Sequence, residues 1–351
     1  MRALVHSHLP AWLASPTKRA TIHIQRAVNI VPVPWTQQRP LILGPMQGLT
    51  NRALRAVFGQ TVRPDVLFTE FVRVRPRAKQ LIANSDFSEA LSTVPGIPLV
   101  VQVIGSADEG VVQATKDLVA RGVQHINVNM GCPWGRMTSV LAGGGMFRSP
   151  ETVEPMLTEL RKLVPGSLSV KTRTGIDDER QIFKVLAAFE NAGIDFLAVH
   201  PRTVAQKYRG DANHDLTREI VAHTSLTVIA NGDIRDEVDA ARVLEHTGAS
   251  GLMLGRGAIS DPKLFERIRG HAPPRPSGEE RKRELAEHLE LLLSAYVDLF
   301  HGDAQIISKF RENLAHVDDP DLARWIKKLK KRRQVAGVRE LLAEAQTIQP
   351  S

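Results

Sequence analysis

From residue 41 onward the chain alternates short apolar runs with longer amphipathic stretches. The apolar runs are rich in Val, Ile and Leu and do not alternate with polar residues, a pattern typical of parallel strands buried on both faces. Three of the intervening stretches end in a glycine suited to cap a helix, Gly122, Gly193 and Gly248. The predicted strands are residues 41–44, 66–69, 98–104, 125–129, 168–171, 196–200, 227–231 and 251–255, and the clearest predicted helices are residues 107–122, 150–164, 178–193 and 235–248.

Eight strand–helix units within about 215 residues predict an α/β fold, a closed (β/α)8 TIM barrel. A doubly wound open sheet is the alternative architecture for such a pattern. No GxGxxG motif follows the first predicted strand, so a Rossmann dinucleotide site has no support in this sequence.

The strand-like runs stop at the proline cluster of residues 273–276, and only helical patterns follow, at residues 279–300, 305–315 and 321–345. We therefore expect three regions: a basic N-terminal extension at residues 1–38, a barrel at 39–272, and a small all-helical C-terminal domain at 277–347. The prolines would form the linker between the last two.

The charge balance favours a polyanionic partner. The chain has 46 Lys and Arg against 38 Asp and Glu, and its pI is near 9.8. No run of eighteen apolar residues is present, so no membrane span is expected. Cys132 is the single cysteine, which excludes an internal disulfide and fits a reducing compartment.

Two segments carry charge of one sign. Residues 1–64 lack Asp and Glu, which fits an organellar transit peptide, a disordered basic arm or an upstream start codon. Residues 324–339 carry eight basic residues and no acid, and form either a solvated helix face or a phosphate-contacting surface. Six of the eight fall within seven positions: Lys327, Lys328, Lys330, Lys331, Arg332 and Arg333.

Polar residues follow or end every predicted strand, at the barrel end where TIM-barrel chemistry occurs. Any one of them could satisfy a local backbone group, but so many together indicate a bound polar ligand. Glycine-rich turns at residues 231–233 and 255–257 could hold phosphate, and Gln102 and Lys171 could face a planar heterocycle. Cys132, between a glycine and a proline, is expected in a turn at the barrel mouth, as a proton donor or a nucleophile.

The segment from Asn129 to Pro133, with Gly143, Gly144 and Gly145 downstream, resembles the signature loop of the tRNA-dihydrouridine synthases. The resemblance runs from about residue 41 to 268 and more loosely through the helical tail, which in that family clamps tRNA. It implies FMN as cofactor, NADPH or NADH as reductant and no metal. The implied FMN-contacting residues are Pro45, Met46, Gln47, Gln102, Lys171, His200, Asn231, Gly232, Asp233, Gly255 and Arg256.

The same resemblance implies the chemistry. Hydride reaches C6 of a flipped-out uracil, Cys132 protonates C5, Asn129 holds the uracil edge, and Lys171 stabilises the reduced flavin. The segment from Thr69 to Val74 is similar to the bacterial branch that modifies position 16 of the D-loop. The tRNA contacts implied by this likeness are Arg73, Arg173, Tyr208 and Lys309, together with the six clustered basic residues.

The chain departs from the family pattern at Trp134, where small polar residues are commoner, and at Met146 and Phe147. We expect a monomer in the cytoplasm that acts on tRNA. Three alternatives stay open at this point: an FMN barrel acting on a free pyrimidine, an RNA-binding module without turnover, and a sugar-phosphate lyase that uses Lys171 as a Schiff base.

Overall fold

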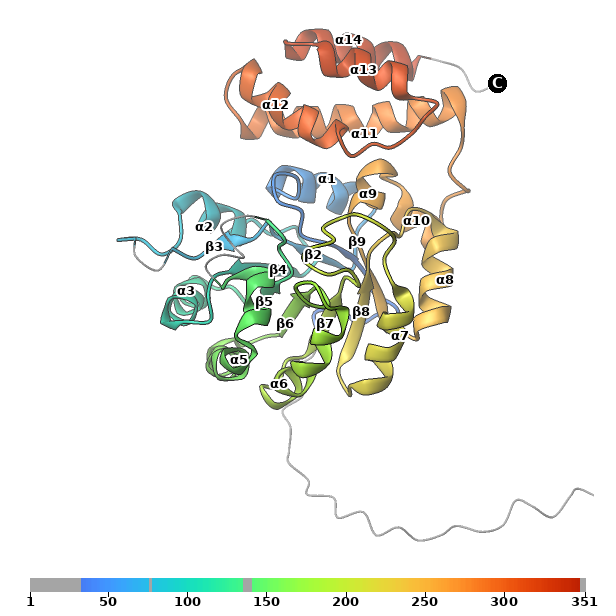
Figure 1. Cartoon of the computed structure of the whole chain (residues 1–351). Coiled ribbons are helices and arrows are strands. Elements are labelled where there is room, and N and C mark those ends of the chain that lie inside the picture. The colour runs from blue at the N-terminus through green and yellow to red at the C-terminus, as the bar shows by residue number, and fades with distance from the viewer. Residues whose placement is uncertain (1–32, 76–77, 135–140, 348–351) are drawn as a thin grey trace, which may run out of the picture. The chain divides into compact units, whose positions relative to one another are not determined.

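The strands of the structure close into a parallel barrel (Figure 1). The computed structural model describes residues 33–75, 78–134 and 141–347, so most of the predicted N-terminal extension lies outside the described residues. β1 pairs with both β2 and β9, and β2 also pairs with β4, which closes the ring and excludes the open sheet. The barrel strands are β1 (Leu41–Leu43), β2 (Val66–Phe68), β4 (Leu99–Ile104), β5 (His125–Met130), β6 (Leu168–Thr172), β7 (Phe196–Val199), β8 (Thr227–Asn231) and β9 (Gly251–Leu254).

The TIM-barrel prediction is therefore confirmed, with each predicted strand present within a residue or two. One strand was not predicted, the two-residue β3 (Val72–Arg73), which pairs with the end of β4 beside the barrel. Two residues are too few to give a periodic signal in the sequence.

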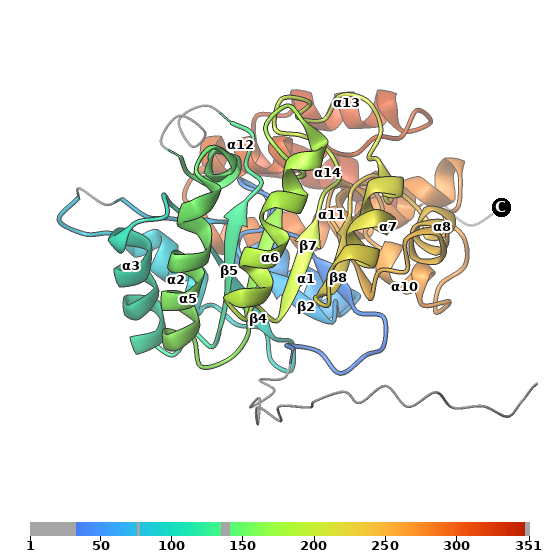
Figure 2. The ribbon, with the colours of Figure 1, turned by 60° about the horizontal axis from the view of Figure 1, so that its bottom comes forward.

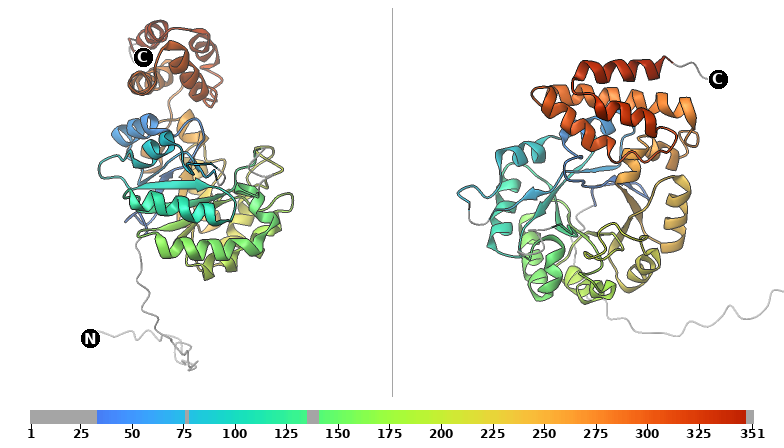
Figure 3. Two further views of the ribbon diagram at one scale, coloured as in Figure 1. Left: turned by 90° about the vertical axis from the view of Figure 1, so that its left-hand side faces the viewer. Right: turned by 45° about the horizontal axis from the view of Figure 1, so that its top comes forward.

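Helices surround the strands, as the view along the barrel shows (Figure 3, right). The predicted glycine caps Gly122, Gly193 and Gly248 have φ of 97°, 69° and 68°, so each adopts the left-handed conformation that favours glycine. The predicted helix at 178–193 is divided at Val185 into a 3-10 segment, η3, and a short α-helix, α6. The elements are α1 (Arg52–Thr61), α2 (Asn84–Leu91), α3 (Glu109–Ala120), η1 (Gly143–Arg148), η2 (Pro150–Thr152), α5 (Val153–Leu163), η3 (Glu179–Lys184), α6 (Leu186–Asn191), α7 (His214–His223), α8 (Glu237–Thr247), α9 (Arg256–Ser260) and α10 (Leu264–Ile268).

The base of the barrel interior is apolar. Ile42, Phe68, Phe196 and Met253 belong to one buried cluster there, and Val33 and Trp35 pack against it. The Trp35 and Phe196 rings meet edge to face at 4.9 Å between centroids.

Four helices follow the barrel in the part of the chain that the structure describes: α11 (Gly278–Leu299), α12 (Asp303–Leu314), α13 (Ala323–Lys331) and α14 (Val335–Gln346). α11 packs on α1 and on α14, and its apolar residues share a hydrophobic cluster with the barrel helices (Figures 1 and 2). Among the described residues no helix is both long and apolar enough to cross a membrane. The division into a barrel and a separate helical domain stays a prediction.

The single helix expected at residues 321–345 is wrong, because the chain breaks at Arg332, whose ψ is 141°. The residues from Lys330 to Gln334 offer no apolar side chain to bury, so a continuous helix would gain nothing there. The break is held from outside: Arg311 donates to the Arg332 carbonyl at 2.7 Å, and the Val335 amide donates to the Asp303 carboxylate at 3.2 Å.

Candidate functional site

A cavity of about 640 Å³ opens at the carboxyl ends of the barrel strands. Most of the residues predicted to contact the cofactor line it, together with one predicted tRNA contact. They are Pro45, Met46, Lys171, His200, Tyr208, Asn231, Gly232, Asp233, Gly255 and Arg256.

Lys171 is the central cation of this cavity. It lies on β6 and has no hydrogen-bond or ion-pair partner among the described residues. Burial and, to a smaller extent, the charge of Arg173 lower the pKa of its ammonium to about 7, although Cys132 acts in the opposite direction. A buried amine without a partner is costly, so this position fits a ligand that supplies an acceptor or a negative charge.

His200 faces the cavity as a neutral ring. The Arg202 guanidinium donates to its Nε2 at 2.9 Å, and because arginine cannot accept, the ring proton must be on Nδ1. Burial, followed by the charges of Lys171 and Arg173, holds the pKa of His200 well below its usual value. Arg202 also binds the Asp233 carboxylate, which fixes the turn after β8.

Two glycines leave room along the cavity wall. Gly232 has φ of 117°, and a Cβ there would lie 2.8 Å from Cδ2 of His200. A Cβ on Gly255 would lie 3.5 Å from the sulfur of Met46. A side chain at Gly232 would therefore clash with His200. At the two turns where the sequence predicts a phosphate-binding site, the cavity wall consists of backbone atoms.

Below the cavity a ladder of buried amides crosses the barrel. Gln102 donates to Asn127 at 2.8 Å and accepts from Asn129 at 2.8 Å, and Asn127 donates to Ser169 at 2.9 Å. The Gln102 backbone amide donates to the Thr69 hydroxyl at 3.1 Å. Gln102 thus lies beneath the cavity and does not line it.

The Cys132 turn is shaped by Asn129. The Asn129 amide oxygen accepts from the Gly131 and Cys132 backbone amides at 3.0 and 2.9 Å, which closes a tight turn directly after β5. Gly143 and Gly144 pack against this turn, where added Cβ atoms would lie 3.1 Å from the Cys132 Cβ and 3.2 Å from its carbonyl oxygen. Cys132 is half-buried and close enough to Lys171 to influence its charge.

Arg173, a predicted tRNA contact, is more deeply buried than a residue on a binding surface would be. Its side chain is buried and donates to the carbonyls of Gly131, Thr203 and Lys207 at 3.0, 2.9 and 2.6 Å. Its guanidinium carbon is also 5.3 Å from the centre of the Tyr208 ring. Arg173 therefore links the loop after β5 to the loop after β7. Its direct contact with tRNA stays a prediction.

The other predicted tRNA contacts lie outside the cavity. Arg73 is exposed on β3, and Lys309 on α12 pairs with Glu312 at 2.8 Å. The six clustered basic residues occupy α13 and the turn after it, all exposed except the half-buried Lys330. Within the described part of the chain none of the six has an ion-pair partner.

One wall of the cavity comes from beyond the barrel, and the residues at the strand ends did not predict it. It consists of Arg275, residues 315–318 and Pro320. Nothing in the strand pattern points to these residues, whereas Arg202, two positions after His200, could have been found from its place at a strand end. Gln47, a predicted cofactor contact, is exposed and does not line the cavity.

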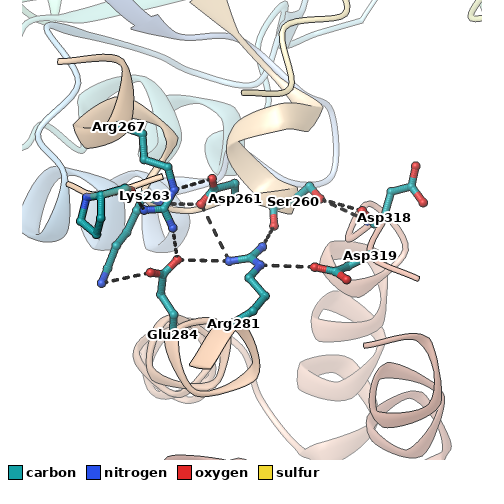
Figure 4. Close-up of polar contacts among 9 residues, drawn as sticks. Ser260, Asp261, Lys263, Arg267, Arg281, Glu284, Asp318 and Asp319 are labelled. Carbon is teal, nitrogen blue, oxygen red and sulfur yellow. Dashed lines mark hydrogen bonds and ion pairs between the residues drawn. The ribbon is translucent and has the colours of Figure 1, made fainter. Parts of the chain in front are cut away.

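An ion cluster holds this outer wall to the barrel (Figure 4). Arg281, buried at the start of α11, binds the Ser260 carbonyl and donates to Asp319 at 3.3 Å and to Glu284 at 3.2 Å. Ser260 in turn accepts from the Asp318 amide at 3.2 Å. Asp261, Lys263 and Arg267 complete the cluster.

Among the described residues there is no group of His, Cys, Asp and Glu that could hold a metal ion. The cavity instead presents cations, backbone turns and a neighbouring thiol. Such a set can hold a planar, partly anionic ligand and deliver a proton next to it.

Comparison with known proteins identifies the family. The sequence model described as dihydrouridine synthase matches residues 42–345. The tRNA-dihydrouridine synthase B of Klebsiella pneumoniae is 34% identical over 272 residues, covering 75% of this chain and 80% of that protein. Its namesake from Escherichia coli (strain K12) is 33% identical over 266 residues, covering 73% and 81%.

Among solved structures, TcOYE with pHBA has a TM-score of 0.50 at 11% identity, covering 69% of this chain and 91% of that one, which shows the fold alone. Both curated relatives carry the name synthase B, so the likeness to the position-16 branch is not confirmed. The family match extends from β1 into α14 and includes the Cys132 turn and the cavity. The chain belongs to the dihydrouridine synthase family of flavin-dependent oxidoreductases.

Proposed function

We propose that the protein is a tRNA-dihydrouridine synthase that reduces the C5=C6 bond of a D-loop uridine, with FMN as cofactor and NADPH or NADH as reductant. The observation that carries this proposal is the placement of the Cys132 turn beside the cavity that contains the unpartnered Lys171. A proton donor next to a cationic cavity is what reduction of a flavin-proximal double bond requires.

The cavity residues fit FMN. The Lys171 amine would offer a cation to the flavin ring, and the turns at Gly232 and Gly255 would leave backbone exposed for the phosphate. Arg256 lies at the same turn, where its guanidinium is 3.3 Å from the Asp233 carboxylate. When bound, the reduced cofactor supplies the hydride for C6 of the uracil.

The protein's own groups complete the reaction. The Cys132 thiol donates its proton to C5, and solvent returns a proton to the thiolate. Asn129 uses one amide hydrogen on Gln102, which leaves the second hydrogen for a uracil carbonyl. The unpaired basic residues of α13 contact tRNA phosphates while the uridine is flipped from its stack.

The position of the uridine is the finer part of the proposal. The segment from Thr69 to Val74 favours position 16, whereas both relatives named above are synthase B proteins. We also propose a cytoplasmic monomer, in keeping with the single thiol and a tRNA substrate.

Nucleoside mass spectrometry of tRNA from cells lacking the gene, mapped by position, tests the proposal. Loss of dihydrouridine at one D-loop site, restored by the wild type and not by Cys132→Ala, is the expected result, and the site that loses the modification identifies the position. Unchanged dihydrouridine in a genome without a second synthase would contradict it. Reduction of free orotate by the purified protein would instead favour an enzyme of free pyrimidines, and a protein without a flavin spectrum would exclude both.

A further inference from the structure

Two exposed aromatic side chains lie on the loops that follow β5 and β7. Trp134, two residues after Cys132, is 53% exposed, and Tyr208 is 47% exposed. Large aromatic side chains are normally buried, so two exposed rings on loops at the catalytic end of one barrel indicate a contact surface.

Arg173 holds these two loops at a fixed spacing. Its Nε donates to Gly131 in the first loop at 3.0 Å, and its Nη1 donates to Thr203 and Lys207 in the second at 2.9 and 2.6 Å. Lys207 has φ of 54°, a strained value for a non-glycine residue that such contacts must maintain. The Trp134 and Tyr208 side chains therefore belong to two loops that Arg173 holds together by hydrogen bonds.

A cationic side chain lies next to each of the two aromatic rings, Trp134 and Tyr208. The Lys207 ammonium lies 4.5 Å from the centre of the Trp134 ring, and the Arg256 guanidinium lies 4.5 Å from the centre of the Tyr208 ring. The Lys207 ammonium covers only part of the Trp134 indole, because that side chain remains half exposed. Exposed aromatic faces interleaved with cations are the combination that binds single-stranded nucleic acid, since bases stack on rings and cations meet phosphates.

We propose that Trp134 is a stacking platform for an unpaired tRNA nucleotide next to the uridine that is reduced, with Lys207 contacting the adjoining phosphate. The inference rests on the proposed function and adds a specificity-determining residue to it. Because only Pro133 separates Trp134 from Cys132, a base stacked on the indole would be a near neighbour of the uridine that is reduced, and the stacking would contribute to the affinity for tRNA.

Trp134→Ala, Trp134→Phe and the control Leu91→Ala test the proposal in the flavin-loaded enzyme with unmodified tRNA transcripts. Leu91 is a 42% exposed apolar residue at the end of α2, near the opposite end of the barrel. Removal of one stacked base should raise the KM for tRNA about 5- to 100-fold in Trp134→Ala. The kcat and the rate of flavin reduction by NADPH should stay within about twofold, and Trp134→Phe should keep most of the affinity.

Tryptophan fluorescence gives a readout that does not depend on turnover. Binding of tRNA should quench the wild type, and the quenching should be smaller in Trp134→Phe. A Trp134→Ala enzyme with the KM of Leu91→Ala, or one with reduced kcat and unchanged KM, would overturn the platform. If the wild type forms no dihydrouridine, the proposed function fails, while the tRNA-binding titration still decides whether Trp134 contacts a base.

Discussion

Asn129 uses both ends of its side-chain amide to shape the site. Its nitrogen donates to Gln102 below, and its oxygen accepts the two backbone amides that form the Cys132 turn. The sequence predicted the place of these residues, because polar groups after parallel strands collect at one end of a barrel. It did not predict that Asn129 also forms the turn, since that depends on which backbone amides come within reach.

Lys171 gives the site a dependence on pH. Its ammonium has a pKa of about 7, so the side chain is charged below that pH and neutral above it. Binding of an electron-rich flavin favours the charged form, and above pH 7 the amine must first take up a proton. We therefore expect FMN affinity to fall as pH rises above about 7, by up to about tenfold per unit, as measured by flavin fluorescence titration.

Lys171→Met should bind FMN more weakly at pH 6.5 and should lack this pH dependence. The control is Lys162→Met, because Lys162 is exposed on α5 and, within the described ranges, pairs with Glu159 alone. If FMN affinity fell equally steeply with pH in Lys171→Met and in the wild type, a group other than Lys171 would be responsible for the pH dependence.

At the scale of elements, the apolar runs were sufficient to predict the strands, because a parallel strand buried on both faces leaves a nearly continuous signal. Helix breaks were harder to predict. The division between α13 and α14 depends on Asp303 and Arg311 in α12, which contact the break from about 20 to 30 residues away in sequence, further than a local pattern can report.

The ion cluster around Arg281 joins three such elements: the end of α9, the start of α11 and the turn before α13. Arg281→Met would leave Asp261 and Asp319 buried with fewer cations, and burial already raises the pKa of the Asp261 carboxyl. We expect the free energy of unfolding to fall by about 3–5 kcal/mol, as measured by urea denaturation.

The matched control is Lys282→Met, next in sequence. Among the described residues Lys282 pairs with the exposed Glu279 alone, so its replacement should change the free energy of unfolding by less than about 0.5 kcal/mol. An Arg281→Met protein as stable as this control would show that the cluster contributes nothing to stability.

For the whole molecule, charge is distributed unevenly. The chain carries a formal net charge of +8, and the unpaired basic residues of α13 lie on the helices that follow the barrel. The composition predicted a polyanionic partner, and the run of basic residues within 324–339 predicted where it would bind. The sequence could not predict that the six clustered cations lack a carboxylate partner among the described residues, because this depends on the folded chain.

Replacing Lys327, Lys328 and Lys331 together by Gln should weaken tRNA binding. For each phosphate that these side chains no longer neutralise, the slope of log affinity against log salt should also fall by about 0.7–0.9. Filter binding at several salt concentrations measures both effects. Lys116, Lys162 and Lys184, exposed on the barrel helices, form the control triple, and an equal decrease in affinity there would mean that net charge alone is responsible.

The half-buried Cys132 also decides how the protein responds to peroxide. Oxidation of a thiol first gives a sulfenic acid, which a second cysteine can capture as a disulfide before it oxidises further. This chain has no second cysteine, so only an external thiol such as glutathione can rescue the oxidised side chain. If Cys132 is the proton donor that we propose, oxidation beyond that stage to the sulfinic acid would remove it irreversibly, and tRNA made afterwards would lack the dihydrouridine that the protein forms.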